Sequence, residues 1–279
     1  MDMFDTLIDA QQLHCHLQAP ELVVVDCRFD LGVPEAGRAN WLEGHVPGAR
    51  YADLEADLSG PPRTDRGRHP LPSAAELCRL FGRLGIDTTS QVVAYDDNHG
   101  MVAARLWWML RYLGHRAVAV LDGGWPAWVA AGLPLERGAV PAGTAHFTGR
   151  ARRKRLVTLD EVGAANALLD AREPARFRGE VEPIDPVAGH IPGARNHCWR
   201  DNLGADGRFL APAELRARLA HALGRSADDT TVHYCGSGVS ACHNVLAQVV
   251  AGWPEPRLYC GSWSEWCRDP SRQVMMGDA

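Results

Sequence analysis

The sequence predicts an α/β protein that contains two domains of the same fold. The chain has 279 residues, which is long enough for two ordinary domains with ample core. Motifs of the first half return in the second half in the same order. Within each half, short apolar runs alternate with helical patterns, which indicates α/β units around a mainly parallel sheet.

Three motifs carry the internal repeat. They are an apolar run ending in Asp-x-Arg (22–28 and 167–172), the turn Gly-His-[Val/Ile]-Pro-Gly-Ala-Arg (44–50 and 189–195) and a pair of tryptophans (123–128 and 261–266). The repeated unit of roughly 120 to 140 residues is far longer than a solenoid repeat of about 20 to 50. We therefore expect one domain at 1–138, a linker at 139–155 and a second domain at 156–279.

The expected elements alternate along each half. In the first half they are a strand ending in the Asp-x-Arg motif, a helix at 74–84, a strand at 92–95, a helix at 102–113 and a strand at 117–121. In the second half, the β-branched and aromatic run at 230–234 is typical of a strand, and a helical pattern starts near Ala241. Because ligands gather at the carboxyl ends of strands in such sheets, the residues that follow 230–234 are candidates for a site.

Composition excludes several classes of protein. Hydrophobic residues make up 46% and charged residues 23%, as in soluble globular proteins, and the net charge of −5 argues against general affinity for nucleic acid or anionic membranes. The acidic start lacks the pattern of a secretory signal, and Arg105 and Arg111 interrupt the most apolar stretch. The eight cysteines show neither a CxxC pair nor zinc-like spacing. We expect a cytoplasmic protein with free thiols, no metal, and a solvated basic linker at 150–155.

Cys235 heads the loop Cys-Gly-Ser-Gly-Val-Ser-Ala at 235–241, between the expected strand and helix. Gly236 and Gly238 allow a tight loop whose backbone N–H groups point at one atom, and the helix dipole adds positive potential there. Such a cradle stabilises a thiolate, or an anionic group attached to its sulfur. The alternative is an inert cysteine buried in a turn.

The first half has no equivalent thiol. Aligning 238–241 with 100–103 places Asp97 at the position of Cys235. We therefore expect the first domain to be catalytically silent and to contribute side chains to a cleft between the domains. His45 and His190 recur in both halves, so we expect them to stabilise their turns rather than to react.

These motifs together resemble the tandem-domain rhodanese superfamily over nearly the whole chain. The cysteine loop is most similar to that of 3-mercaptopyruvate sulfurtransferases, which characteristically read Cys-Gly-[Ser/Thr]-Gly-Val-Thr-Ala, with Ser240 here at the threonine position. The resemblance implies two rhodanese-like domains, no cofactor, and a persulfide that forms on Cys235. It also implies that the loop binds the transferred sulfur, through Gly236, Gly238, Val239, Ser240 and Ala241.

The same resemblance implies further site residues. Arg176 matches the arginine that binds the donor's carboxylate, and Ser237, His69 and Glu55 match a serine–histidine–carboxylate relay. His69 could instead be an ordinary histidine in a Pro-rich loop. A second arginine, which these enzymes place in a Glu-Pro-x-Pro-Arg stretch, is absent because 182–186 reads Glu-Pro-Ile-Asp-Pro. Arg172, repeated as Arg28, is expected to be structural, and Arg178 is open between solvent and site.

The expected activity is transfer of sulfur from 3-mercaptopyruvate to thioredoxin, a small thiol or cyanide. Thiosulfate is the alternative donor, although the loop lacks the cations beside the cysteine that would suit a dianion. A cysteine-dependent phosphatase would need an arginine six positions after the cysteine, where this chain has Ala241. A non-catalytic sulfur carrier or binding module is the weaker alternative. Cys260 is either a second thiol near the site or simply buried.

Overall fold

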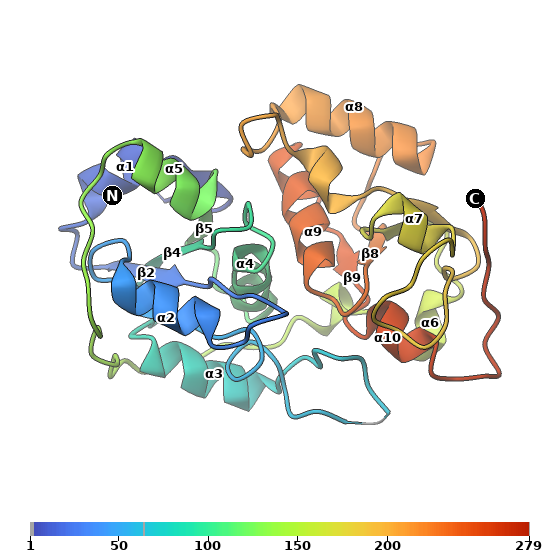
Figure 1. Ribbon diagram of the computed structural model, residues 1–279, viewed down its shortest axis with the longest axis horizontal. Helices are drawn as coiled ribbons and strands as arrows, with labels where there is room; N and C mark the ends of the chain where they lie inside the picture. The colour runs from blue at the N-terminus through green and yellow to red at the C-terminus, as the bar shows by residue number, and fades with distance from the viewer. Residues whose placement is uncertain (1–2, 64, 279) are drawn as a thin grey trace. The chain divides into compact units, whose positions relative to one another are not determined.

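The computed structural model describes residues 3–63 and 65–278, which form two compact units (Figure 1). The first unit comprises the described residues of Met1–Gly60 and Pro72–Arg152, and the second those of Pro61–Leu71 and Arg153–Ala279. The change between units therefore falls inside the expected linker. Residues 61–71 fall within the range expected for the first domain but group with the second unit, to which hydrogen bonds from Arg68 N–H to Ser264 Oγ and from Arg268 to Arg66 O join them.

The described part of the first unit forms a five-stranded sheet in which every pair of neighbours is parallel, with the order β1-β5-β4-β2-β3. Its strands are β1 (Leu7–Ile8), β2 (Leu22–Asp26), β3 (Arg50–Tyr51), β4 (Gln91–Tyr95) and β5 (Val118–Leu121). Its helices are α1 (Ala10–His16), α2 (Ala36–Glu43), α3 (Ala74–Arg83), α4 (Ala103–Tyr112) and α5 (Gly124–Ala130). α1 and α5 pack against the sheet through Leu13 and Trp128.

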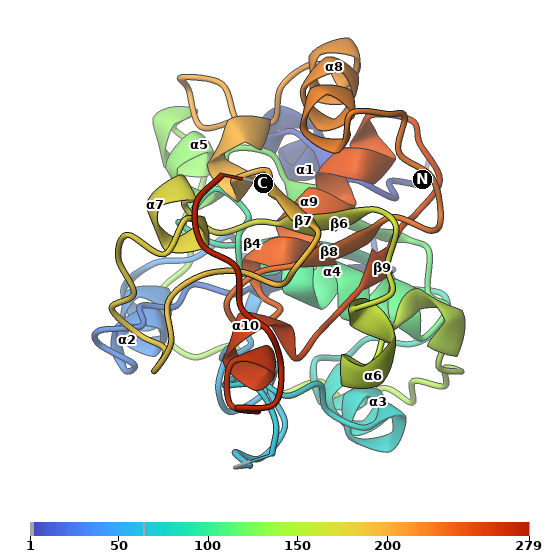
Figure 2. The same cartoon turned by 90° about the vertical axis from the view of Figure 1, so that its right-hand side faces the viewer.

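The described part of the second unit forms a four-stranded parallel sheet with the order β7-β6-β8-β9 (Figure 2). Its strands are β6 (Leu168–Asp170), β7 (Ala194–Asn196), β8 (Val232–Tyr234) and β9 (Arg257–Leu258). Its helices are α6 (Leu159–Val162), α7 (Pro174–Phe177), α8 (Pro212–Leu223), α9 (Ser240–Val250) and α10 (Ser262–Trp266), with short 3₁₀ turns η1 (Arg153–Arg155) and η2 (Trp199–Asn202).

Helices cover both faces of the second sheet. Leu169 packs with α8 and α9, whereas its neighbour Leu168 packs with α6 and α10. Successive strand residues point to opposite faces, so a sheet buried on both sides needs apolar residues at consecutive positions, as in this run. The two α/β units with parallel sheets confirm the expected fold class. Among the described residues, no helix is both long and apolar enough to cross a membrane.

The repeated motifs make the same contacts in each unit. Arg28 and Arg172 each bind the aspartate two residues before them, with Nη2–Oδ2 distances of 2.6 Å in both cases. Each guanidinium also donates to the carbonyl of the glycine that starts the repeated turn. His45 and His190 each bind a backbone carbonyl through Nδ1. These groups therefore hold the strand ends and turns together, as the repeat predicted.

Candidate active site at the end of strand β8

Cys235 follows β8 directly and is buried, with 2% of its surface exposed. Its backbone N–H donates to Ser262 Oγ at 3.1 Å, and its carbonyl accepts the N–H of Trp263 at 3.0 Å. Its Sγ accepts the backbone N–H of Gly238 at 3.1 Å. The start of α10 thus fixes the cysteine backbone, while its own loop binds the sulfur.

Gly238 is required by the shape of this loop. Its φ is +78°, in the left-handed region, and a Cβ added there would lie 2.3 Å from the carbonyl oxygen of Cys260. No other residue fits without moving the backbone. α9 begins two residues later at Ser240, so the unpaired N–H groups and positive dipole of an 11-residue helix lie beside the sulfur.

In the first unit, the equivalent loop surrounds a carboxylate where the second unit has a thiol. Tyr95 and Tyr234 end equivalent strands, since the hydroxyl of each accepts a backbone N–H from the repeated turn. The next residues also correspond, because Asp96 O accepts the N–H of Trp125 as Cys235 O accepts that of Trp263. Asp96, not Asp97, therefore stands where Cys235 does.

Our alignment was wrong by one position because the first loop is one residue longer. The left-handed glycine of the first loop, Gly100, comes four positions after Asp96, whereas Gly238 comes three positions after Cys235. The Asp96 carboxylate accepts four backbone N–H groups, from Asn98, Gly100, Val102 and Ala103, at 2.8 Å each. Burial raises the pKa of Asp96, while these bonds favour its charged form. A loop of this kind can therefore hold a buried anion.

His69 lies against the cysteine loop. Its Nδ1 is 2.7 Å from Ser237 Oγ, and both residues are buried. The segment that carries His69 is bound to the second unit, since Arg68 N–H donates to Ser264 Oγ at 3.0 Å and the Arg268 side chain donates to Arg66 O at 2.7 Å. The structure thus joins two members of the relay that the resemblance implied.

Glu55, the third member, belongs to the first unit. It is exposed and its backbone N–H donates to Asp53 Oδ1 at 2.8 Å. Its part in a relay with His69 remains a prediction.

Arg176 lies on α7 with its guanidinium beside the cysteine loop. A Cβ added at Gly236 would be 3.6 Å from Arg176 Nη1. Its Nη2 pairs with Glu182 Oε1 at 2.6 Å and with Asp185 Oδ2 at 3.3 Å. Burial alone would raise the pKa of Glu182, but the hydrogen bond from Arg176 brings that pKa below its usual value.

Sequence reasoning missed Arg68 and Asp185. Arg68 forms an ion pair with Asp185, and its Nη2 would lie 2.9 Å from a Cβ added at Gly236. Their positions in the sequence could have indicated both residues. Arg68 precedes the relay histidine, and Asp185 lies in the stretch from which the family's second arginine is absent.

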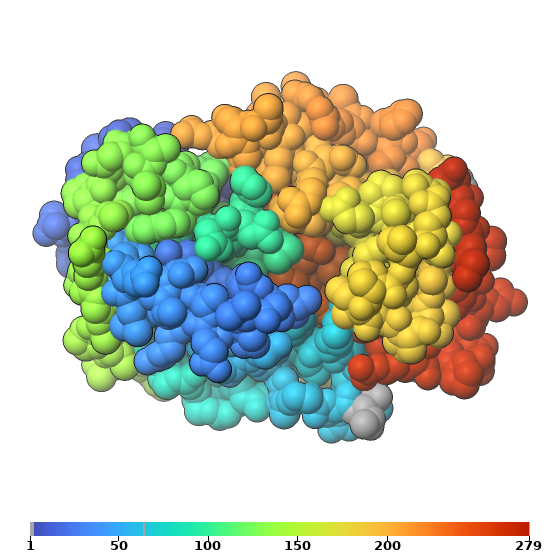
Figure 3. Space-filling view, viewed as in Figure 1, coloured from blue at the N-terminus to red at the C-terminus, as the bar shows by residue number. Residues whose placement is uncertain are grey.

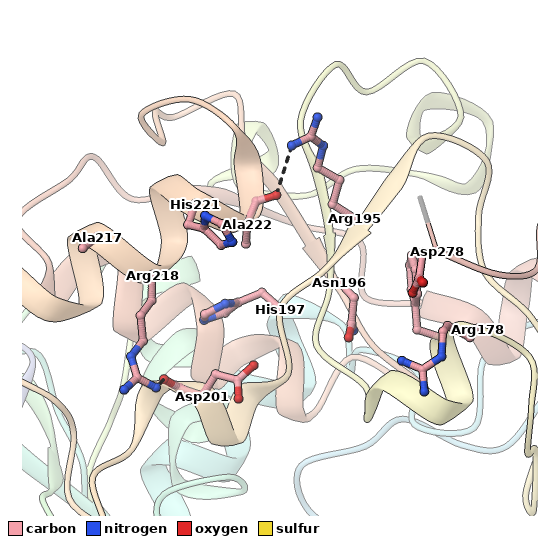
Figure 4. Close-up of a pocket in the computed structure, with 11 residues that line it drawn as sticks. Arg178, Arg195, Asn196, His197, Asp201, Ala217, Arg218, His221, Ala222 and Asp278 are labelled. Atoms are coloured by element: carbon pink, nitrogen blue, oxygen red, sulfur yellow. Dashed lines mark hydrogen bonds between the residues drawn. The ribbon is translucent and has the colours of Figure 1, made fainter.

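Arg178 is outside this group of residues. It pairs with Glu180 and, with Arg195 and Arg218, lines a surface cavity of about 700 Å³ in which no residue of the 235–241 loop takes part (Figure 4). Cys260 is buried with its backbone against Gly238, and a role for its thiol remains a prediction. In residues 3–63 and 65–278, no cluster of three histidine, cysteine or acidic side chains could hold a metal ion.

This arrangement suits nucleophilic chemistry at sulfur. The thiol has a backbone N–H donor on its Sγ, a helix N-terminus next to it, a hydroxyl–imidazole pair in its loop and two guanidinium groups at Gly236. The N–H donor and the helix N-terminus can stabilise negative charge on sulfur, the hydroxyl–imidazole pair can move a proton, and the guanidinium groups can bind an anionic part of a substrate.

Comparisons with known proteins agree with this geometry. The Rhodanese-like domain matches at residues 9–131 and 155–269. The chain is 52% identical to a Pseudomonas aeruginosa protein named "Probable 3-mercaptopyruvate sulfurtransferase", over 98% of both chains. It is 43% identical to the Mycobacterium tuberculosis "Putative thiosulfate sulfurtransferase SseB", also over 98% of both. The solved 3-mercaptopyruvate sulfurtransferase from Leishmania major matches with a TM-score of 0.83 at 34% identity, covering 94% of this chain and 74% of that one. The chain therefore belongs to the rhodanese-like family and carries two copies of its domain.

Proposed function

We propose that this chain is a sulfurtransferase that takes sulfur from 3-mercaptopyruvate and passes it to a thiol or to cyanide through a persulfide on Cys235. The observation that carries the proposal is the contact between Cys235 Sγ and Gly238 N–H at the N-terminal end of α9. This environment stabilises a thiolate before the reaction and the charged outer sulfur after it.

The first step breaks the carbon–sulfur bond of the donor. The Cys235 thiolate attacks the donor's sulfur, and the electron pair of the C–S bond leaves with carbon as the enolate of pyruvate. That enolate takes up a proton to give pyruvate. In the proposed step Ser237, which is in hydrogen-bond contact with His69, delivers this proton, and His69 restores it.

The second step regenerates the enzyme. A thiolate acceptor, such as thioredoxin or a small thiol, attacks the outer sulfur of the persulfide. The S–S bond breaks, its electron pair returns to Cys235 as a thiolate, and the acceptor leaves as a persulfide. Cyanide would leave as thiocyanate by the same displacement.

Two features favour mercaptopyruvate over thiosulfate as the donor. The residues directly after Cys235, Gly236 and Ser237, are neutral, and the relay pair Ser237–His69 is useful only for a leaving group that needs a proton. Sulfite, the leaving group from thiosulfate, is already a stable anion. Thiosulfate remains the second candidate, because the Mycobacterium tuberculosis relative bears that name.

Mass spectrometry of the intact protein tests the proposal. The protein is treated with mercaptopyruvate or thiosulfate at equal concentration, and the added sulfur is located by peptide mapping. We expect one sulfur on the Cys235 peptide, faster loading from mercaptopyruvate, and no turnover by Cys235→Ser. Cys260→Ser is the matched control and should keep its activity. A persulfide found only on Cys260, or full activity of Cys235→Ser, would refute the assignment.

A further inference from the structure

We propose that the surface cavity of about 700 Å³ beside β7 binds a free α-amino acid through both its ammonium and its carboxylate group. The cavity lies within the second unit and shares no residue with the 235–241 loop. Its volume falls in the range of about 300 to 1000 Å³ that is usual for small-molecule sites. This site goes beyond the proposed function, because its ligand is neither the sulfur donor nor the sulfur acceptor.

The cavity lies at the carboxyl end of β7, the position at which parallel sheets commonly bind ligands. Asn196 is the last residue of β7 and His197 follows it, and both line the cavity. Figure 3 shows the C-terminal residues (red) along the side of α7 and the segment after it (yellow), with α8 (orange) above them. These three parts of the chain supply the walls, which include apolar surface from Phe177, Ala217 and Ala222.

The side chain of Asn196 offers a hydrogen-bond acceptor to the cavity. Its Nδ2 donates to the backbone carbonyls of Asp170 and Arg172, at 2.9 Å each. Both amide hydrogens are thereby used, which fixes the orientation of the amide. Its Oδ1 has no partner among the described residues, so it can accept an N–H of a ligand.

His197 offers a second acceptor, because its hydrogen bonds fix its tautomer. Burial lowers its pKa, so the ring is neutral and carries one proton. Asn244 Nδ2 donates to His197 O at 2.8 Å, and Asn244 Oδ1 therefore accepts from Asn202 Nδ2 at 2.7 Å. This leaves Asn202 Oδ1 to accept from His197 Nε2 at 2.8 Å. The proton stands on Nε2, and Nδ1, which has no partner within residues 3–63 and 65–278, is an acceptor.

Two carboxylates line the cavity near these acceptors. Figure 4 shows Asn196 and His197 between Asp201 on one side and Asp278 on the other. Neither carboxylate forms a hydrogen bond or an ion pair in the described part of the chain. An ammonium group has three N–H donors and a positive charge, so it suits a site of neutral acceptors and carboxylates.

Three guanidinium groups also line the cavity, and one of them is available to a ligand. Arg178 pairs with Glu180, and Arg218 pairs with Glu214. Arg195 forms no ion pair with a described residue, and its hydrogen bond to a backbone carbonyl is long, at 3.4 Å. Arg195 is therefore the group that binds a carboxylate.

The two kinds of charge favour a zwitterion. A simple anion at Arg195 would also face the carboxylates of Asp201 and Asp278, and a simple amine would leave the guanidinium without a partner. A free α-amino acid carries an ammonium and a carboxylate on one carbon, so it can satisfy both parts of the cavity.

Isothermal titration calorimetry of the full chain with each standard amino acid except cysteine tests the site. Cysteine is left out because its thiol can accept sulfur. We expect at least one amino acid to bind with a Kd below about 1 mM. Its amide, which lacks the carboxylate, and its deaminated acid, which lacks the ammonium, should each bind at least about tenfold more weakly. The proposal is overturned if none of the amino acids binds, or if the deaminated acid binds as well as its parent.

Two variants test the two ends of the ligand separately. Arg195→Gln should weaken the amino acid at least about tenfold but leave the amide within about threefold, because the amide has no carboxylate to lose. Arg50→Gln is the matched control, since Arg50 holds the same place in the repeated turn of the first unit and donates to backbone carbonyls there. Equal weakening of the amino acid and its amide in Arg195→Gln would contradict the part assigned to Arg195.

Asp201→Asn supplies an independent measurement should Arg195→Gln fail to fold, because Asp201 is exposed. It should weaken the amino acid at least about tenfold and leave the deaminated acid as tightly bound as before, or more tightly bound. Asp206→Asn, an exposed aspartate in the next loop, is the control and should change neither affinity. Wild-type affinity in Asp201→Asn would contradict the placement of the ammonium.

Cys235→Ser separates this cavity from the cysteine loop. The variant should bind the amino acid as wild type does, because no residue of the loop lines the cavity. Loss of binding in this variant would place the amino acid at the cysteine loop and overturn the proposal.

Discussion

Replacing Gly238 with alanine tests the sulfur-binding loop most directly. Two costs follow from the structure. Alanine at φ +78° costs about 1 to 2 kcal/mol because it must adopt the left-handed region. Its Cβ would also lie 2.3 Å from Cys260 O, so the loop must move away from that backbone. Since Gly238 N–H donates to Cys235 Sγ, this movement displaces the donor from the sulfur.

The expected loss of activity is larger than the loss of stability. Removing one preorganised backbone donor from a developing anion costs about 2.7 to 4 kcal/mol of transition-state stabilisation, or roughly 100- to 1000-fold in rate. We expect Gly238→Ala to lower the rate of persulfide formation by about that factor while the protein stays folded. Rapid-quench mass spectrometry of single-turnover loading measures this rate, and thermal unfolding measures stability.

Gly193→Ala is the matched control for this experiment. Gly193 has the same φ of +78° in the same unit, but a Cβ there would meet nothing within 4 Å. It should therefore show the conformational cost of alanine without loss of persulfide formation. The reasoning is refuted if folded Gly238→Ala loads within about threefold of wild type, or if both variants lose activity equally.

Three further predictions concern other parts of the second unit. Ser237→Ala should slow turnover of mercaptopyruvate far more than that of thiosulfate, and Ser237→Lys should shift the preference toward thiosulfate. Steady-state assays with both donors in parallel measure these effects, and equal loss with both donors in Ser237→Ala would leave the relay through His69 unsupported. Arg176→Ala should cost about 1.5 to 3 kcal/mol of transition-state stabilisation for mercaptopyruvate, measured as a fall in kcat/KM, and an unchanged kcat/KM would place the carboxylate elsewhere. Burial lowers the pKa of His233 to about 4, so this ring stays neutral in the fold but gains a proton on unfolding below about pH 6.5. The free energy of unfolding should therefore fall by up to about 3 kcal/mol as the pH drops from about 6.5 to 4. Urea titrations should show a shallower fall with pH in His233→Gln and an unchanged fall in the exposed control His221→Gln. The same dependence on pH in both variants would contradict the assignment.

The sequence alone determined the features that depend on local pattern. The apolar runs predicted parallel strands, and the repeated motifs predicted two copies of one fold. The two glycines around Ser237 predicted a tight anion-binding loop at a strand end, because a left-handed turn before a helix depends on few residues. Arg176 was predicted from its match to the arginine of the similar family, and its guanidinium lies beside Gly236 in the structure.

Only the tertiary structure decided how distant segments complete the site. Ser237 and His69 are 168 residues apart in sequence, yet their side chains lie in hydrogen-bond contact. Residues 61–71 group with the second unit through bonds to α10, and this placement also brings Arg68 to Asp185. No local pattern encodes such a contact, since it depends on how segments that are far apart in the sequence pack together in the folded chain. For the same reason an alignment by motif misplaced the equivalent of Cys235 by one residue, and backbone hydrogen bonds corrected it to Asp96.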